Sequence, residues 1–298
     1  MTRRRRFDML ILTSGAEEIA SAIPLCGTPP DRIARFLDKR EIQQFIEDLG
    51  IPIPPLVPEG KYPAMIKPRC GSGGWRNRVI GNAREREVWD TEFGEMPAIT
   101  QAVAPGTPAS VCCVADGTRA AAIAVNEQIL RGNGPGRYGF SGSVTPFDHP
   151  LRETMIRHAE TIAAASGCVG TVGIDFVIGD SVWAIEINPR FQGTLDTVEM
   201  ATGRNLFLDH TNACRGILPV TRPDPVQYAA RSILFADRDL TIRDDLALLA
   251  PAVADIPPKG TPIEESKALV SVYGWGASRE AALALLDKNI NRVNQYVR

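Results

Sequence analysis

Short apolar segments separated by turn residues run along most of the chain, and several of them alternate apolar with polar positions. Such alternation is typical of half-buried strands, whereas apolar positions at helical spacing indicate helices. The two patterns occur in turn, so we predict an α+β (mixed α/β) fold with antiparallel sheets. Strands are expected at residues 7–13, 64–66, 79–80, 98–103, 110–115, 120–128, 172–178, 182–188, 227–236 and 268–273. Helices are expected at residues 31–50, 83–93, 151–166, 194–201 and 205–214, and from 278 onward.

Two glycine-rich stretches interrupt this pattern. The first, residues 71–74 (the glycine loop), has the sequence Gly-Ser-Gly-Gly and follows a strand that runs into Lys67-Pro68. Glycines let backbone N–H groups approach phosphates closely and a lysine adds a point charge, so a phosphate site is one interpretation and an ordinary hairpin turn is the other. The spacing matches neither the P-loop nor the dinucleotide-binding pattern. The second stretch, residues 131–143, is predicted to be a loop, and loops of that length are usually functional or disordered.

The segment from 172 to 188 carries the most information. Side chains of a strand alternate between two faces, so burying the apolar face of each strand turns Asp175, Glu186 and Asn188 to the opposite face of a hairpin. The apolar faces comprise Ile174, Phe176 and Ile178 on the first strand, and Trp183, Ile185 and Ile187 on the second.

A connection of four residues, 179–182, then sets Asp175 directly opposite Glu186 and Phe176 opposite Ile185. Other registers that keep the same facing displace the pair by about one side-chain repeat. Two carboxylates and an amide oxygen suit Mg²⁺, which binds one or two carboxylates together with phosphate oxygens and water. Like charges so close are unfavourable without a cation between them. The alternative is a polar outer face with two exposed acids.

Length, charge and hydropathy exclude several classes of protein. A chain of 298 residues corresponds to about two domains. A net charge of −2 gives no broad basic surface, so we expect no nucleic-acid partner and no membrane partner. The longest apolar stretch, residues 246–254, contains Pro251 and is far shorter than the roughly 20 residues that cross a bilayer.

The cysteines are scattered and do not form a metal-binding or disulfide pattern. There are six, with no C-x-x-C pair, and only three histidines accompany them. We therefore expect no zinc site and no disulfide framework, but buried thiols in a cytoplasmic protein. Cys112 and Cys113 lie mid-strand without a histidine partner, so no nucleophilic role is expected for them.

Taken in order, these motifs resemble the ATP-grasp superfamily. The resemblance covers roughly residues 32–219. It implies an ATP-grasp fold, in which two α+β lobes clasp ATP behind a short N-terminal segment. The motifs are Lys67-Pro68, the glycine loop, Pro105-Gly106, Gly173-x-Asp175-Phe176 and Glu186-x-Asn188-Pro189-Arg190. The expected divisions are residues 1–37 for the N-terminal segment, 38–103 for the small lobe, 104–220 for the large lobe with the metal site, and 221–298 for its C-terminal part.

The same resemblance implies roles for individual residues. Lys67 and Lys39 would bind phosphates. The alternative for Lys39 is a solvent-exposed charge on a helix. Arg190 would stabilise the transferred phosphoryl group; the alternative is that Arg190 forms an ion pair at the surface. The β- and γ-phosphates would be covered by the glycine loop, Gly71, Ser72, Gly73 and Gly74. Adenine would contact backbone groups of the hinge, Gln101, Ala102 and Val103. Two Mg²⁺ ions, or Mn²⁺ as an alternative, would be held by Asp175, Glu186 and Asn188.

The substrate side is less defined. Asn126 and Gln128 are two residues apart and share a strand face, and with Gly142 and Ser143 they are expected to border the substrate pocket. Arg131 and Arg137 either meet a substrate carboxylate or are solvated loop charges.

The chain also departs from the family pattern. Many members carry a ribose-binding glutamate shortly after the hinge glycine, but here Gly106 is followed by Thr107, Pro108 and Ala109. Either other groups contact the ribose or the nucleotide binds more weakly. The N-terminal segment is also shorter than the doubly wound domain of many relatives. The substrate side is therefore either incomplete or supplied by a dimer partner.

The implied activity is ADP-forming ligation of a carboxylate to an amine through an acyl phosphate. Asp255-Ile256-Pro257 and residues 278–281 resemble the tail of archaeal members close to the tyramine–glutamate ligases of methanofuran biosynthesis, so glutamate and tyramine or a similar amine are the expected substrates. Two alternatives stay open, a carboxylase that activates bicarbonate and a non-catalytic ATP-sensing module. A homodimer is one expected assembly, because relatives are often dimers.

Overall fold

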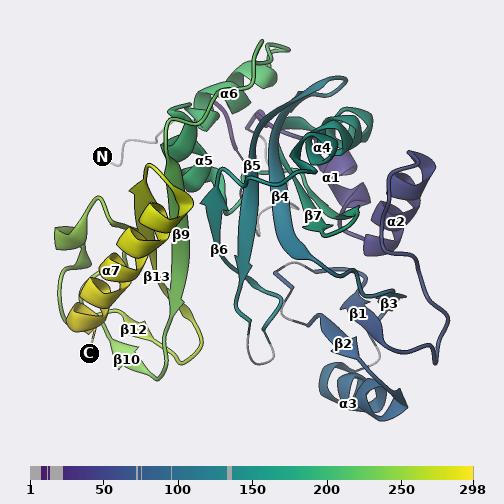
Figure 1. The fold of residues 1–298 in the computed structure, drawn as a ribbon, viewed down its shortest axis with the longest axis horizontal. Helices are drawn as coiled ribbons and strands as arrows, with labels where there is room; N and C mark the ends of the chain where they lie inside the picture. Colours follow the sequence, from purple (N-terminus) through teal and green to yellow (C-terminus); the bar gives the residue numbers. More distant parts are fainter. Residues whose placement is uncertain are drawn as a thin grey trace.

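The computed structural model describes residues 8–11, 13, 23–71, 73–74, 76–94, 96–132 and 136–297. Within this part of the chain the strands form an eight-stranded sheet, a three-stranded sheet and a two-stranded ribbon, with helices packed against them (Figure 1). The strand expected at residues 7–13 falls partly outside the described residues, and only an isolated parallel bridge between Leu10 and Leu25 is found there.

The eight-stranded sheet is antiparallel throughout and forms the large lobe. Its order is β11-β13-β9-β6-β5-β4-β7-β8. The predicted antiparallel α+β architecture is therefore confirmed. The strands are β4 (Thr107–Asp116), β5 (Ala120–Leu130), β6 (Phe140–Thr145), β7 (Val169–Ile178), β8 (Val182–Asn188), β9 (Tyr228–Phe235), β11 (Val253–Ala254) and β13 (Ala268–Gly276).

Helices cover both faces of this sheet, because its central strands are apolar on both sides. On β4, Cys113 packs toward α4 (Arg152–Ser166), whereas its neighbour Cys112 packs toward α6 (Leu206–Ala213) on the other face. This alternation follows from the two-residue period of a strand. Two further helices complete the lobe, α5 (Leu195–Thr202) beside α6 and α7 (Arg279–Val297) against β13 and β9.

The three-stranded sheet forms the small lobe, with the order β2-β1-β3. Its core is Trp89 of α3 (Ala83–Phe93), which packs against Ile66 and Ile80 and donates its indole N–H to the Arg76 carbonyl at 2.9 Å. Helix α3 begins at residue 83, as predicted, because Asn82 accepts from the Glu85 N–H. The strands are β1 (Ala64–Pro68), β2 (Arg78–Ile80) and β3 (Ala98–Gln101).

The single helix expected at residues 31–50 is two helices, α1 (Pro30–Arg35) and α2 (Lys39–Asp48). Asp38 breaks the run, because its carboxylate accepts from the Arg40 N–H as an N-cap and also pairs with Arg69. Apolar residues of α2 pack into the core of the large lobe rather than against the three-stranded sheet, although the sequence assigned residues 38–103 to the small lobe.

Other predicted boundaries need correction. Residues 131–143 were expected to be loop, but β6 begins at Phe140 because those residues pair with both β5 and β9. Residues 240–263 form short elements that the pattern did not predict. A two-residue strand, β10 (Leu240–Thr241), pairs with β12 (Pro262–Ile263), and a short 3₁₀ helix, η1 (Leu246–Leu249), precedes β11. Cys70 is exposed rather than buried. Among the described helices, none is long and apolar enough to cross a membrane.

Candidate functional site

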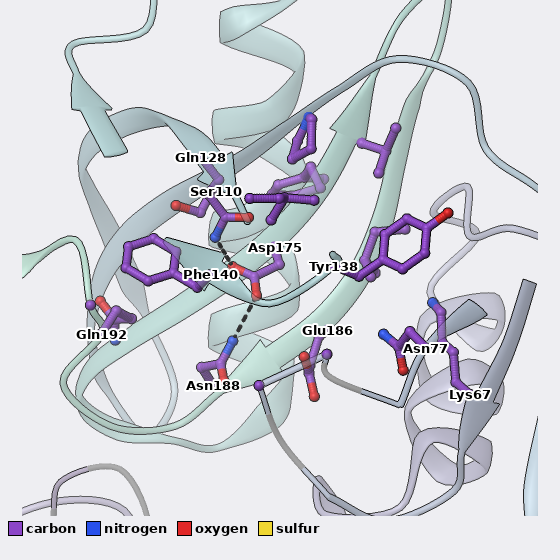
Figure 2. A pocket seen from close by; sticks show the side chains of 18 of the residues that line it. Lys67, Asn77, Ser110, Gln128, Tyr138, Phe140, Asp175, Glu186, Asn188 and Gln192 are labelled. Atoms are coloured by element: carbon purple, nitrogen blue, oxygen red, sulfur yellow. Dashed lines mark hydrogen bonds between the residues drawn. The ribbon is translucent and has the colours of Figure 1, made fainter. Parts of the chain in front are cut away.

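A cavity of about 800 Å³ lies between the two lobes, with walls from both sheets. The small lobe contributes Lys67, Val79 and residues of the glycine loop, and the large lobe contributes Gln128 and Asp175. Figure 2 shows polar side chains reaching this space from several strands and from the segments that connect them. A cavity of this size is in the range that small-molecule sites occupy.

The hairpin of β7 and β8 places Asp175, Glu186 and Asn188 (the donor triad) on the cavity wall. Asp175 pairs directly with Glu186, as the sequence predicts. A β-bulge follows at once, so Phe176 pairs with Ala184 and not with Ile185. Because the extra residue reverses the facing of the strand, Val182, Ala184 and Ile187 form the buried face. The expected face of Trp183, Ile185 and Ile187 was therefore wrong, and Ile185 lines the cavity.

Two amides hold the Asp175 carboxylate in place. Gln128 donates to Oδ1 at 2.9 Å, and Asn188 donates to Oδ2 at 3.0 Å (Figure 2). Arg190 in turn donates from Nη2 to the Asn188 side-chain oxygen at 3.0 Å. Burial, and secondly the negative charge of Glu186, raises the pKa of Asp175 to about 7, against these hydrogen bonds.

The donor triad fits a magnesium ion by its chemistry. Two carboxylates and an amide are paired across one hairpin, and burial, with the charge of Glu186 second, raises the pKa of Asp175, so its negative charge is unfavourable there by itself. A divalent cation would remove this penalty, and hard cations prefer oxygen ligands of this kind. The Asn188 amide now donates to Asp175, so it would turn to present its oxygen to a cation.

Lys67 is the buried cation of the opposite wall. Its side chain comes from β1, and the residue is only 7% exposed. Burial lowers the pKa of Lys67 to about 8, although the charge of Glu186 opposes the shift. In Figure 2 it lies on the same side of the cavity as Asn77, with Glu186 between it and Asn188. A buried ammonium of this kind is suited to binding an anion that replaces its lost hydration.

Lys39 lies beneath the glycine loop and does not line the main cavity. It donates to the Gly71 carbonyl at 2.7 Å and is 3.6 Å from the Glu186 carboxylate, with 12% of its side chain exposed. These contacts do not fit a solvated helix charge. Lys39, Gly71 and Glu186 border a small separate cavity of about 40 Å³. The lysine therefore links the loop to the donor triad.

The glycine loop meets the cavity through Gly73 and Gly74. Gly74 has a φ of 66°, and a Cβ there would lie 2.4 Å from the Tyr138 carbonyl oxygen. Glycine is thus required where the loop passes the connection between β5 and β6. Of the other two residues expected to cover phosphate, Gly71 borders only the small cavity, and Ser72 lies outside the described residues.

The hinge residues Gln101, Ala102 and Val103 all line the cavity. The Ala102 N–H already donates to the Pro55 carbonyl at 2.8 Å. The Gln101 amide donates to the Gln43 side chain on α2, at 2.6 Å. These bonds fix the hinge backbone at the edge of the small sheet.

The expected substrate residues separate into two groups. Gln128 lines the cavity, but Asn126, Gly142 and Ser143 do not. Asn126 and Ser143 are fully buried behind the wall, and a Cβ on Gly142 would lie 2.0 Å from the backbone of Arg231. Arg131 and Arg137 also lie away from the cavity: Arg131 stacks on Phe235 and donates to the Ser266 carbonyl, and Arg137 stacks on Tyr138.

Several cavity residues were not identified from the sequence. Asn77, Gln192, Arg231 and Asp255 all line the wall. One signal pointed to Arg231, because it is the only charged residue within the strand Tyr228–Phe235. Asp255 belongs to the tail motif Asp255-Ile256-Pro257, but that motif did not place it in the cavity, and no comparable signal marks Gln192, which lies in a connecting segment.

A comparison with known protein families is consistent with a site built from the glycine loop, the hinge and the donor triad. The profile of the family described as ATP-grasp domain matches residues 36–194, more than half of the chain. The chain belongs to the ATP-grasp family. The two lobes therefore form an ATP-grasp fold, as the motifs predicted.

The ATP-grasp chain is similar to one region of much longer proteins. It is 24% identical over 302 residues to the arginine-specific large chain of carbamoyl phosphate synthase from Halalkalibacterium halodurans, covering 91% of this chain and 28% of that one. A second such large chain, from Ralstonia nicotianae, is 26% identical over 211 residues, covering 63% of this chain and 19% of that one. The chain thus spans less than a third of the length of these curated relatives.

Solved structures share the fold at low identity. N5-carboxyaminoimidazole synthase from Aspergillus clavatus, solved with ADP and 5-aminoimidazole ribonucleotide, has a TM-score of 0.74 at 15% identity, covering 95% of this chain and 80% of that one. An L-amino acid ligase from Bacillus licheniformis has a TM-score of 0.71 at 14% identity, covering 90% and 73%. At these identities the likeness establishes the fold alone.

Proposed function

We propose that this chain is an ATP-dependent carboxylate–amine ligase that forms ADP and passes through an acyl phosphate. The observation that carries the proposal is one cavity in which the buried Lys67 and the glycine loop of the small lobe face the donor triad and Arg190 of the large lobe. Phosphoryl transfer needs mainly positioning and charge stabilisation, and this set of groups offers both. No side-chain nucleophile is required.

In the first step, an oxygen of the substrate carboxylate attacks the γ-phosphorus of ATP, and ADP leaves. Lys67 and the backbone N–H groups of Gly73 and Gly74 would hold the phosphate oxygens. Arg190 would stabilise the charge that develops on the transferred group. The donor triad would hold Mg²⁺, which when bound neutralises phosphate charge.

In the second step, the amine nitrogen attacks the carbonyl carbon of the acyl phosphate, and phosphate leaves. Overall, a carboxylate, an ammonium ion and ATP give an amide, ADP, hydrogen phosphate and one proton. The hinge residues would bind the adenine. The ribose contact that a glutamate makes in many relatives would fall to other wall residues, such as Ser110, which follows that position on β4.

The test is release of ADP and phosphate with Mg²⁺ and a matrix of carboxylic acids against amines, with glutamate and tyramine as one pair. Release that needs both an acid and an amine supports the ligase. Hydroxylamine added with each acid alone traps an acyl phosphate as a hydroxamate, and so identifies the acid before the amine is known. No ADP release with any acid, together with no binding of Mg²⁺–ADP, would contradict the proposal.

A carboxylase is the second candidate, because the Aspergillus clavatus structure with this fold is a carboxyaminoimidazole synthase. ADP release that requires bicarbonate in place of an organic acid would favour it. ATP binding without release under any condition would favour a sensing module instead. The glutamate–tyramine pair stays one arm of the matrix.

A further inference from the structure

The cavity also extends to the other side of Asp175 from Lys67. Four of its lining residues, Phe140, Gln192, Arg231 and Asp255, are here called the far end. In Figure 2, Phe140 and Gln192 lie on the opposite side of Asp175 from Lys67 and Asn77. The carbonyl of Gly193, next to Gln192, accepts from Arg231 at 2.6 Å, which places Arg231 at the same end. The roles proposed above for ATP use none of these residues.

Arg231 is the cation of the far end, but its donors are already used. Its side chain is only 11% exposed. Nε and Nη2 donate to the Ser271 hydroxyl at 3.2 and 2.7 Å, Nη1 donates to Gly193 and is 3.3 Å from Asp196, and Nη2 also donates to Asp255 at 2.9 Å. A guanidinium has five N–H donors on three nitrogens, and each nitrogen here has a partner. An anionic substrate would have to displace a carboxylate to reach it.

Asp255 is the charge that faces the cavity. Its side chain is 65% exposed and lines the wall, whereas Asp196 is absent from the cavity lining in the described part of the chain. Arg231 and the Ser271 hydroxyl both donate to Oδ2 of Asp255, which leaves Oδ1 on the exposed side chain to accept from a ligand. Two carboxylates flank one guanidinium, so this group of three carries a net charge of −1.

Apart from the Gln192 amide, the remaining wall of the far end is apolar. Phe140 and Leu130 line it, and the missing Cβ of Gly193 makes room for the Phe140 ring, because a Cβ there would lie 2.7 Å from the ring. An exposed carboxylate beside an apolar wall matches a ligand with a cationic head and an apolar body. Directly beside Asp255, bicarbonate or a carboxylate would instead meet a like charge.

We propose that the far end binds the amine substrate as its ammonium ion, with Asp255 as the counter-charge and Arg231 as the residue that positions Asp255. The substrate class is a primary amine with an apolar or aromatic body. The proposal rests on the proposed function, since the amine is the second substrate of that ligase.

The first test is binding, measured as the melting temperature with and without Mg²⁺–ADP. The probes are tyramine, phenethylamine and hexylamine, each paired with the alcohol that has a hydroxyl in place of the amine. We expect at least one amine, and none of the alcohols, to raise the melting temperature. Asp255→Asn should remove this rise: it deletes the charge, while asparagine, like aspartate, tolerates the positive φ of 55° found here.

Asp196→Asn is the matched comparison. It removes the same charge from the neighbourhood of Arg231, but from a side chain that does not line the cavity. It should retain amine binding within about threefold, whereas Asp255→Asn should weaken it at least about tenfold. Amine binding that is absent from the wild-type protein, equal for amine and alcohol, or unchanged in Asp255→Asn would overturn the proposal.

The second test is kinetic and separates the far end from phosphoryl transfer. Hydroxylamine is uncharged near neutral pH, so it does not need an anionic subsite. Asp255→Asn should raise the KM for an ammonium-type amine at least about tenfold and leave ATP-dependent hydroxamate formation unchanged within about twofold. An equal loss with both nucleophiles would overturn the proposal. A failure of the ligase itself looks different, with no Mg²⁺–ADP binding and no hydroxamate from any acid.

Discussion

Two groups of polar side chains lie close together, one behind the cavity wall and one facing the cavity, and they differ in charge and in hydrogen bonding. One is a polar network behind the cavity wall, formed by Asn126, Ser143, Thr145 and Thr197 and joined to Ser110, which itself lines the cavity. Its members are buried and neutral, and they bond to one another: Asn126 accepts from Thr145 at 2.7 Å and donates to Ser110 at 3.2 Å, and Thr197 lies 2.9 Å from both Ser143 and Thr145.

The other group faces the cavity and is charged. Lys67 and Asp175 both have pKa values moved toward neutrality, mainly because burial removes water from them. A satisfied neutral network stabilises the fold, whereas charges kept without full compensation cost stability and are suited to a ligand that supplies the missing partner. The two groups should therefore respond to substitution with opposite signs.

The largest effect is expected from Lys67→Met. Removing the ammonium from the phosphate side should reduce ATP turnover about 100- to 1,000-fold. The free protein should become more stable, by up to about 3 kcal/mol at pH 7, because the pKa of Lys67 falls from 10.5 in the unfolded chain to about 8 in the fold. Calorimetric binding of Mg²⁺–ADP and denaturant unfolding measure the two effects.

Lys61→Met is the control for that experiment, since it makes the same chemical change at an exposed position of the same lobe. It should leave ADP affinity unchanged and shift the free energy of unfolding by less than about 0.5 kcal/mol. A destabilised Lys67→Met protein would contradict the comparison.

Thr197→Val tests the polar network with almost no change in shape. It removes a hydroxyl that contacts Ser143 and Thr145 and donates to the Thr194 carbonyl, so buried polar groups lose partners. The free energy of unfolding should fall by about 2–3 kcal/mol, with ADP affinity unchanged within about twofold. Thr197→Ser, which keeps the hydroxyl, should recover most of the stability. If ADP affinity fell in parallel with stability, the network would belong to the binding site.

The affinity for ADP should depend on pH through Lys67. Its pKa of about 8 means that the charged fraction falls roughly tenfold between pH 7 and pH 9, so ADP should bind about tenfold more weakly at the higher pH. Adenosine, which has no phosphate, should show no such change. The stability difference between Lys67→Met and wild type should shrink as pH rises from about 8 toward 10.5, because the folded wild-type protein loses its buried charge. A constant ADP affinity over this range would argue against a phosphate contact.

The smallest effect is expected from Gln128→Met. Gln128 donates to Asp175 at 2.9 Å and positions that carboxylate. Its loss should lower kcat about threefold to tenfold and change the free energy of unfolding by less than about 1 kcal/mol. A stability loss as large as that of Thr197→Val would place Gln128 with the polar network instead.

Asn126 and Gln128 show where sequence reasoning stops. They are two residues apart on β5 and share a face, so alternation assigns them one environment. In the fold, Asn126 lies under β6 and α5 within the polar network, whereas Gln128 has passed the edge of that layer and reaches Asp175. Which of the two meets a ligand depends on what covers each position, and that is decided by segments distant in sequence.

The donor triad shows the reverse case. A short connection and the two-residue period of strands were enough to place Asp175 opposite Glu186, because both rules are local. The same rules failed one residue later, at the bulge that turns Ile185 into the cavity. A bulge inserts an unpaired residue, and nothing in the local pattern marked it.

The sequence alone determined the α+β class, most strands and helices, the glycine loop and the pairing of Asp175 with Glu186, since each follows from period, caps and turn chemistry over a few residues. The tertiary structure decided that Lys67 is buried across from those carboxylates, that Asn126 is structural, and that Arg231 is engaged by Asp196 and Asp255 so that the far end of the cavity is negative. Burial and net charge at a point depend on every element packed around it, and those elements come from positions far apart along the chain.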